Sequence, residues 1–286
     1  MNFLFLFLKE IRLHHWIKNF LVFAPLFFAG HVMSVSELKL TFLLFLAFCF
    51  LASGIYIFND ILDKDRDAQH PHKKNRPIAS GKMSVRTALL IMFIFLVCVA
   101  YISIYFNLKT NILLGLYFLL NLSYSLILKH IALLDIFLVA GLYILRIKAG
   151  GELIDVHVSE WLILVTLFLA LFLVIGKRRA ELISVSSEKT RLVLREYTRE
   201  FLDYCLTVVV AGTLLTYSLY AISANIPYLV YSTFFVFFGM FRYMYVIYIL
   251  DGGEAPEKVL YKDPWIFATM ILWIGYVFIV FYNGVL

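Results

Sequence analysis

Nine apolar runs of roughly membrane-spanning length follow one another along the chain. A transmembrane helix needs about 20 apolar residues, and each run is bounded by charged residues, Gly or Pro. The runs cover residues 16–31, 38–58, 87–106, 111–128, 131–149, 161–176, 203–223, 228–250 and 264–282. A chain with 63% hydrophobic and 15% charged residues is too apolar for a water-soluble globule. We therefore expect an all-α polytopic membrane protein of nine transmembrane helices, folded as a single domain over residues 1–286.

Positive charge falls mostly on one side of this arrangement. If the N-terminus is inside and the runs alternate, most of the 25 Lys and Arg residues lie inside, and only Lys39 and Lys109 fall clearly outside. An excess of Lys and Arg is typical of cytoplasmic loops. We expect a multi-pass protein of the inner membrane with a cytoplasmic N-terminus, an outer C-terminus and its active site facing the cytoplasm. The net charge of +6 then reflects orientation and phosphate ligands, so we expect no nucleic-acid partner.

The densest charge lies at residues 59–81, between the second and third apolar runs. Four oxygen-bearing side chains occur at its start: Asn59, Asp60, Asp63 and Asp67. If the preceding helix continues past the membrane surface, 100° of rotation per residue places all four on one face. Such hard oxygen ligands suit Mg²⁺ bound together with substrate phosphates. We predict a magnesium site of these four residues, with the three aspartates as catalytic groups; the alternative is a charged helix end in water.

Cations follow the acidic residues within the same stretch. His70, His72, Lys73, Lys74 and Arg76 all lie within one short loop. Arg binds phosphate through a bidentate fork and Lys binds it as a point charge. We predict that Lys73 and Arg76 bind phosphate oxygens that the metal does not cover. The alternative is that these residues only set membrane orientation.

Polar residues within or beside the other apolar runs are further candidates. We predict substrate contacts for Lys18, Asn19, Tyr124 and Arg242. The alternative for Lys18 is that it snorkels outward.

Asp135 and Arg146 are two of the three charged residues inside the fifth run. Asp135 needs a cation, which Lys129 or Arg146 could supply, so a structural ion pair and a substrate role both stay open. Arg146 indicates either a broken helix or a structural role.

The segment NDILDKDRD has the form NDxxDxxxD and lies at the end of the second predicted helix. In that position it resembles the first aspartate-rich motif of the UbiA superfamily of intramembrane prenyltransferases. Within the superfamily, five segments are similar to the decaprenyl-phosphate phosphoribosyltransferases: RLHHWIKNFLVFAPLFFAG, HPHKKNRPIASG, SYSLILKHIALLDIF, LYILRIKAGG and GKRRAEL. The resemblance implies helices around a central cavity open to the cytoplasm and laterally to lipid. It also implies a Mg²⁺-dependent transfer of phosphoribosyl from phosphoribosyl diphosphate to a polyprenyl phosphate.

One departure from the wider superfamily favours this narrower reaction. Typical aromatic prenyltransferases have a second aspartate motif after the sixth helix, whereas this chain has Lys177, Arg178, Arg179 and a single Glu181. Two phosphorylated substrates bring more anionic groups than one prenyl diphosphate does. We therefore predict that Lys177 and Arg178 bind substrate phosphates.

Two alternatives stay open at this point. The first is a prenyltransferase that moves a prenyl group from a prenyl diphosphate to an aromatic or lipid acceptor, and the missing second acidic motif argues against it. The second is a transporter, for which Asp135, Arg146 and Arg242 would form a pathway through the membrane. A transporter predicts charge spread through the membrane depth, whereas the charge here gathers at one surface.

Overall fold

The computed structural model describes residues 3–69, 73–184, 192–250, 252–253 and 255–282, and these residues form helices and connecting turns with no β-strand among them. Their contacts divide the chain into two compact units. Unit 1 comprises Met1–Ile127 and Leu145–His157, and unit 2 comprises Leu128–Ile144 and Val158–Leu286. The predicted single domain stays a prediction.

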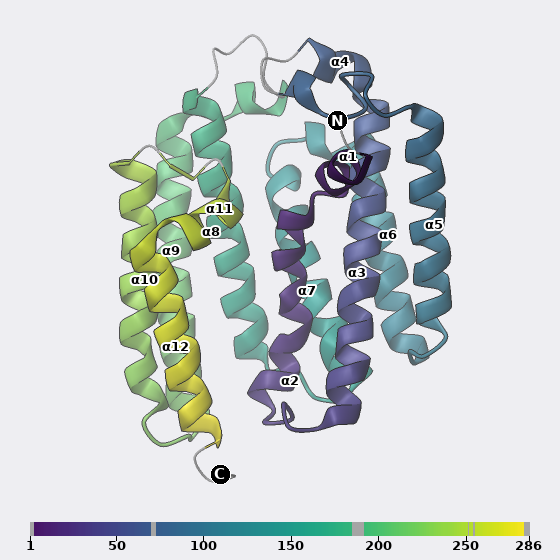
Figure 1. Ribbon diagram of the computed structural model, residues 1–286. Coiled ribbons are helices and arrows are strands. Elements are labelled where there is room, and N and C mark those ends of the chain that lie inside the picture. The colour runs from purple at the N-terminus through teal and green to yellow at the C-terminus, as the bar shows by residue number, and fades with distance from the viewer. Residues whose placement is uncertain (1–2, 70–72, 185–191, 251, 254, 283–286) are drawn as a thin grey trace. The chain divides into compact units, whose positions relative to one another are not determined.

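Unit 1 is organised around α3 (Val35–Leu62), the longest helix of the structure with 28 residues. α5 (Val85–Ser103) packs along α3 (Figure 1), and α6 (Leu108–Leu126) contacts it as well. Side chains cap both of the latter helices: Ser84 Oγ accepts a hydrogen bond from the Thr87 amide, and Asn107 Oδ1 accepts one from the Thr110 amide. Because α5 and α6 both contact α3, the buried face of α3 lies in the core of this unit.

The N-terminal segment of unit 1 is not the single helix that the first apolar run predicts. It consists of α1 (Phe3–Glu10), the 3₁₀ helix η1 (Leu13–Phe23) and α2 (Ala24–Phe28). Pro25 lies in the first turn of α2, where its missing N–H costs nothing. The segment packs on α3, with Ile11 and Val22 buried.

Unit 2 contains the longer C-terminal helices. α8 (Glu160–Ser184) and α9 (Arg199–Ser223) pack side by side, as do α10 (Thr233–Tyr248) and α12 (Pro264–Tyr282) (Figure 1). Gly212 allows the close approach in the first pair, because a Cβ there would lie 2.7 Å from the Phe168 ring. The shorter elements are η3 (Leu128–His130), η4 (Leu192–Glu196), η5 (Leu229–Ser232) and α11 (Pro256–Lys262).

Helix α7 (Leu134–Leu153) belongs to both units, because the boundary at Ile144 and Leu145 falls inside it. The helix is continuous, which removes the broken-helix interpretation of Arg146.

Within the described part of the chain, six helices are long and apolar enough to cross a membrane. They are Val35–Leu62, Val85–Ser103, Glu160–Ile183, Arg199–Ser223, Leu229–Tyr248 and Pro264–Tyr282. α6 and α7 are not among them, and α7 contains Asp135, Arg146, Lys148 and Glu152. Six of the nine predicted spans thus match a helix that is long and apolar enough to cross a membrane, and the full count stays a prediction.

Candidate functional site

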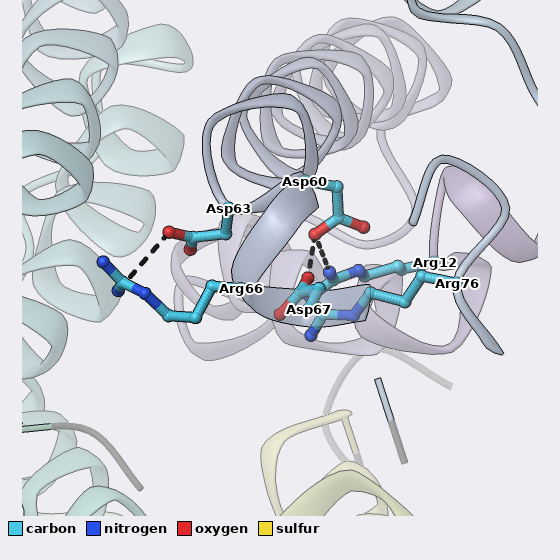
Figure 2. A network of polar contacts seen from close by, with 6 residues as sticks. All are labelled: Arg12, Asp60, Asp63, Arg66, Asp67 and Arg76. Atoms are coloured by element: carbon cyan, nitrogen blue, oxygen red, sulfur yellow. Dashed lines mark hydrogen bonds and ion pairs between the residues drawn. The ribbon is translucent and has the colours of Figure 1, made fainter. Parts of the chain in front are cut away.

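The acidic motif lies where α3 ends. The prediction of one continuous helix through Asp67 is wrong, because α3 ends at Leu62, Asp63 has non-helical dihedrals (φ −93°, ψ 7°) and α4 (Lys64–Ala68) follows. The break separates the aspartates. Asp63 points toward Arg66, with an N···O distance of 3.7 Å, whereas Asp60 and Asp67 turn the other way (Figure 2).

Asp60 and Asp67 are held by two arginines. Arg76 Nη1 donates to Asp60 Oδ1 at 2.8 Å and to Asp67 Oδ2 at 2.5 Å, and Arg12 Nη2 donates to Asp60 Oδ1 at 2.5 Å (Figure 2). Both carboxylates are only 3% exposed. Two buried anions are thus balanced by two cations through charge-assisted hydrogen bonds. The structure therefore brings together three of the predicted site residues, Asp60, Asp67 and Arg76.

The turns of residues 73–81 place Arg76. The Arg76 amide donates to the Lys73 carbonyl, and the Ser80 amide donates to the Arg76 carbonyl. Ile78 is fully buried in the core beside Ile57 of α3. Burial of Ile78 therefore anchors the chain two residues beyond Arg76. Lys73 is half-buried in the short η2 turn (Lys73–Asn75), and His70 and His72 lie outside the described residues.

Arg12 is a part of the network that the sequence pattern did not single out. Its backbone is left-handed (φ 52°, ψ 54°), an uncommon conformation for a residue with a side chain. Its guanidinium lies over the Tyr56 ring, 4.8 Å from the centroid. Glu10, two residues earlier, is also buried, and burial raises its pKa to about 7. In the sequence, Arg12 begins the segment RLHHWIKNFLVFAPLFFAG, one of the five that carry the family resemblance, and Glu10 lies two residues before it.

The donor chemistry of the acidic motif fits Mg²⁺. Asn59 Oδ1 is buried and accepts no hydrogen bond from the described residues, so one hard oxygen donor is available beside the aspartates. Asp60 and Asp67 already approach one nitrogen of Arg76. With the arginines in place, however, no three Asp, Glu, His or Cys side chains of the described residues converge as a metal-binding group.

Asn19 belongs to a buried polar cluster of unit 1. Arg146 Nε donates to Asn19 Oδ1 and Arg146 Nη2 donates to the Tyr117 hydroxyl, both at 2.7 Å. Asn19 Nδ2 in turn donates to Cys49 Sγ at 3.2 Å. Gly150 of α7 permits the close approach of η1, because a Cβ there would lie 2.2 Å from the Val22 carbonyl oxygen. Arg146 therefore has the structural role that was one of its two interpretations.

Lys18 and Tyr124, the other two candidates in unit 1, are half-buried in η1 and in the last turn of α6. Substrate contacts of these residues and of Asn19 stay predictions.

The basic segment of unit 2 is helical, whereas the sixth predicted helix ends at residue 176. α8 continues to Ser184, so Lys177 and Arg178 lie in its last two turns. Arg178 is 3% exposed and forms ion pairs with Asp135 at 2.7 Å and with Glu181 at 2.9 Å. The Tyr197 hydroxyl donates to the second oxygen of Asp135 at 2.6 Å, and burial raises the pKa of Tyr197, which keeps this donor protonated. Asp135 thus lies in a buried ion pair, and its cation is one that the sequence did not assign to it.

Two further arginines of unit 2, Arg179 and Arg242, also contact carboxylates. Arg179 Nε donates to Asp203 at 2.5 Å, and the Arg179 guanidinium covers the Tyr248 ring. Arg242 Nη2 donates to Asp263 Oδ2 at 2.8 Å. These hydrogen bonds from Arg242 hold the pKa of Asp263 below its usual value, and Asp263 also accepts from the first amides of α12. Arg242 therefore links α10 to the start of α12.

The family model of the UbiA prenyltransferase family matches residues 20–275. The chain belongs to the UbiA prenyltransferase family. This UbiA family member is an integral membrane protein and a transferase, in agreement with the apolar helices and with the motif at the end of α3.

Relatives and solved structures agree with this assignment. The UbiA chain is 32% identical to a decaprenyl-phosphate phosphoribosyltransferase of Mycolicibacterium smegmatis, over 94% of this chain and 90% of that protein. It is 31% identical to the protein of the same name from Corynebacterium glutamicum, over 93% of this chain and 84% of that protein. A UbiA homolog from Archaeoglobus fulgidus, solved with DMAPP and Mg²⁺, has a TM-score of 0.73 at 20% identity over 96% of this chain and 98% of that chain. The last comparison shows that the fold is shared.

Proposed function

We propose that the protein transfers 5-phosphoribosyl from 5-phosphoribosyl 1-diphosphate to a polyprenyl phosphate of the decaprenyl type and releases diphosphate. The observation that carries the proposal is the pairing of the buried Asp60 and Asp67 with Arg12 and Arg76 at the end of α3. Carboxylates for a metal and cations for phosphates thus lie within one group of side chains, which suits two phosphorylated substrates. The relatives named decaprenyl-phosphate phosphoribosyltransferase, similar over nearly the whole chain, support the same reaction.

In this reaction a phosphate oxygen of the lipid forms a bond to C1 of the ribosyl donor as the bond from C1 to the diphosphate oxygen breaks. The attacking oxygen is already anionic, so no general base is required. Positioning and charge stabilisation are then the main contributions of the protein. Arg12 and Arg76 would bind phosphate oxygens, and Lys73 and Lys18 would add further positive charge.

Mg²⁺ would be held by Asn59, Asp60, Asp63 and Asp67. When bound, it would supply neutralisation of the negative charge that develops on the leaving diphosphate. The Archaeoglobus fulgidus homologs solved with Mg²⁺ and either DMAPP or GPP support a divalent cation in this fold.

The basic residues of α8 have a narrower part in the proposal than their sequence suggests. Arg178 is already paired with Asp135 and Glu181, so its phosphate role would require it to serve a substrate in addition to these carboxylates. Lys177 lies 3.9 Å from Glu181 and is a third exposed, so it is the better candidate for a phosphate in this segment. Tyr124 and Arg242 stay in the proposal as substrate contacts.

The proposal includes the membrane arrangement. The chain would cross the inner membrane nine times with a cytoplasmic N-terminus and an outer C-terminus. The excess of Lys and Arg at residues 64–86 and 177–199 supports this orientation. The end of α3 then faces the cytoplasm, where a soluble sugar phosphate is available.

A labelled-donor assay tests the reaction. Membranes with the protein are incubated with Mg²⁺, decaprenyl phosphate and phosphoribosyl diphosphate labelled in the ribose, and labelled lipid is measured. We expect labelled lipid that requires both substrates. The second candidate, prenyl transfer, is favoured by the fold neighbours bound to DMAPP and GPP. Labelled product from a prenyl diphosphate and an aromatic acceptor, with none from phosphoribosyl diphosphate, would establish that candidate instead.

A further inference from the structure

Unit 1 contains a small basic cavity beside the Arg12–Asp60 ion pair. Its volume is about 250 Å³. Seven residues line it: Lys9, Arg12, His14, His15, Asp60, Arg76 and Pro77. We propose that this cavity is a subsite for a phosphomonoester group, either the 5-phosphate of the sugar donor or the phosphate head of the lipid. The proposal rests on the proposed function and extends it to Lys9, His14 and His15, which the acidic motif does not include.

The charge of the lining favours an anion. Three permanent cations, Lys9, Arg12 and Arg76, stand against one carboxylate, Asp60. His14 and His15 add imidazole groups, which keep at least one N–H donor in either protonation state. Arg12 and Arg76 are balanced by Asp60 and Asp67 through hydrogen bonds, so the further positive charge at the cavity is that of Lys9, whose ammonium also donates to the exposed Asn75 carbonyl.

One face of α3 supports the lining, and Asp60 is the α3 residue that lines the cavity itself. Ser53, Tyr56 and Asp60 are spaced by three and four residues, so they lie along the same side of the helix. Ser53 Oγ accepts a hydrogen bond from Trp16 Nε1 and donates to the Ile11 carbonyl, which fixes the two ends of the segment that contains His14. This is a preorganised wall rather than a loose surface loop.

Aromatic contacts order the same wall. The His14 and His15 rings are 4.2 Å apart, and the His15 ring lies 5.2 Å from that of Tyr56. Tyr56 also lies under the Arg12 guanidinium. One tyrosine thus positions both an imidazole and a guanidinium at the cavity.

The backbone of Arg12 is a separate indication of function. A non-glycine residue in the left-handed region costs on the order of 1 kcal/mol or more, and such residues cluster at active sites and ligand clamps. Here the left-handed turn lets α1 end at Glu10 while Arg12 reaches Asp60. The strained residue is therefore the one that joins the cavity to the acidic motif.

The size of the cavity defines the ligand class. Sites that enclose a complete small molecule are typically about 300–1,000 Å³, and this one is near 250 Å³. It suits one charged end group rather than a whole phosphoribosyl diphosphate. The cavity would thus anchor one end of a substrate whose diphosphate lies at the acidic motif.

A double variant tests the subsite without touching the acidic motif. Lys9→Gln/His14→Gln changes two exposed lining side chains, and Lys82→Gln changes an exposed cation of the same unit that does not line the cavity. The steady-state KM of each substrate is measured with purified full-length protein. We expect the KM of one substrate to rise about 10-fold in the double variant, with little change in kcat, because charged hydrogen bonds of this kind are worth about a factor of ten or more. Lys82→Gln should match the wild type, and Lys9→Arg should keep most of the affinity.

The substrate whose KM rises identifies the phosphate. A rise for phosphoribosyl diphosphate assigns the cavity to the 5-phosphate, and a rise for the polyprenyl phosphate assigns it to the lipid. Unchanged KM values for both substrates would overturn the subsite while leaving the proposed reaction intact.

A binding measurement separates the subsite from the reaction. Binding of ribose 5-phosphate and of farnesyl phosphate is measured by calorimetry, with ribose as the uncharged control. If the wild type makes no labelled lipid but binds a phosphate probe more tightly than the double variant does, the reaction is wrong and the subsite stands. Equal binding by both proteins would overturn the subsite.

Discussion

Arg178 and Asp135 form a buried ion pair across 43 residues of sequence, with Arg178 Nε donating to Asp135 Oδ2 at 2.7 Å. The two side chains are 3% and 0% exposed. The pair joins the start of α7 to the end of α8 within unit 2. Removal of one partner leaves a buried charge without its counterion, which costs about 3–5 kcal/mol.

Arg178→Ala should therefore destabilise the protein by several kcal/mol, read as a large loss of thermal stability in detergent. Lys177→Ala is the matched control, because its ion pair with Glu181 is partly exposed and should be worth less than about 1 kcal/mol. An Arg178→Ala protein of normal stability with a raised KM for phosphoribosyl diphosphate would show that Arg178 serves the substrate instead.

Asp63→Ala should abolish diphosphate release and leave the fold intact. The ion pair of Asp63 with the exposed Arg66 spans 3.7 Å, so the loss of this pair should change stability by less than about 1 kcal/mol. Asp60→Ala should lose activity and also several kcal/mol of stability, because Arg12 and Arg76 both lose a buried partner. Circular dichroism melts and a diphosphate-release assay separate the two effects.

Asp65→Ala is the control for the acidic motif. Asp65 is exposed in α4 and is not one of the four predicted ligands. It should keep wild-type turnover and stability. Near-normal turnover of Asp63→Ala would remove Asp63 from the metal site.

Arg76→Gln should make the stability of unit 1 depend more strongly on Mg²⁺. In the wild type a single nitrogen of Arg76 binds the carboxylates of Asp60 and Asp67. Without that cation the two anions repel each other, and a divalent ion in their place stabilises the fold by mass action. Thermal melts are compared in EDTA and in 10 mM Mg²⁺. The rise in Tm on adding Mg²⁺ should be larger for the variant than for the wild type. An equal gain in both proteins would argue that Mg²⁺ binds away from Asp60 and Asp67.

Glu10 should make the protein less stable as pH rises. Burial raises its folded-state pKa from 4.5 to about 7, Asp60 raises it further, and Arg12 opposes the shift. The folded state therefore binds this proton more tightly than the unfolded state does, so the favourable contribution is complete below pH 4.5 and is lost as pH rises to about 7.

Glu10→Gln should remove that loss. Between pH 5 and pH 8 the free energy of unfolding of the variant should rise relative to that of the wild type. The rise should be no more than about 3 kcal/mol, since one pKa unit corresponds to about 1.4 kcal/mol. Melts at the two pH values measure the gain, and Glu200→Gln, an exposed carboxylate of α9, should show none. A wild type and a variant with parallel pH profiles would refute the assignment.

Gly150→Ala should destabilise unit 1. An added Cβ would lie 2.2 Å from the Val22 carbonyl oxygen, a backbone atom that cannot rotate away. The shift of η1 from α7 would also break the Arg146–Asn19 hydrogen bond, and overpacking of this kind costs about 1–3 kcal/mol. Gly141→Ala in the same helix has nothing within 4 Å of its Cβ and should be neutral or slightly stabilising. A similar result for both variants would contradict the close approach.

Hydropathy predicted the long helices well where burial in lipid decides the structure. The runs at 38–58, 87–106 and 264–282 all lie within helices or nearly match them. It failed where tertiary contacts decide. The 16–31 run forms η1 and α2 rather than one helix, and Trp16 and Asn19 of η1 bind α3. α8 runs on past residue 176, where Arg178 and Arg179 donate to carboxylates inside unit 2.

The candidate site was predictable only in part, for a related reason. The NDxxDxxxD spacing identified Asp60 and Asp67, and the run of cations that follows it drew attention to Arg76. The rotation of 100° per residue assumes a continuous helix and takes no account of tertiary contacts such as those of Arg12 and Arg76 with Asp60. It therefore could not predict the break at Asp63. The partner of Asp135 lay 43 residues away, beyond the reach of any local pattern.

The N-terminal segment is anchored by polar contacts to residues later in the chain, and three of these contacts are with α3. Trp16 donates a hydrogen bond to Ser53, Asn19 donates one to Cys49, and Arg12 donates one to Asp60. While the protein is being synthesised, residues 3–23 therefore leave the ribosome before any of these partners exist. Their docking must wait until α3 has emerged and formed, so the left-handed turn at Arg12 and the cavity beside it are among the later features of unit 1 to assemble.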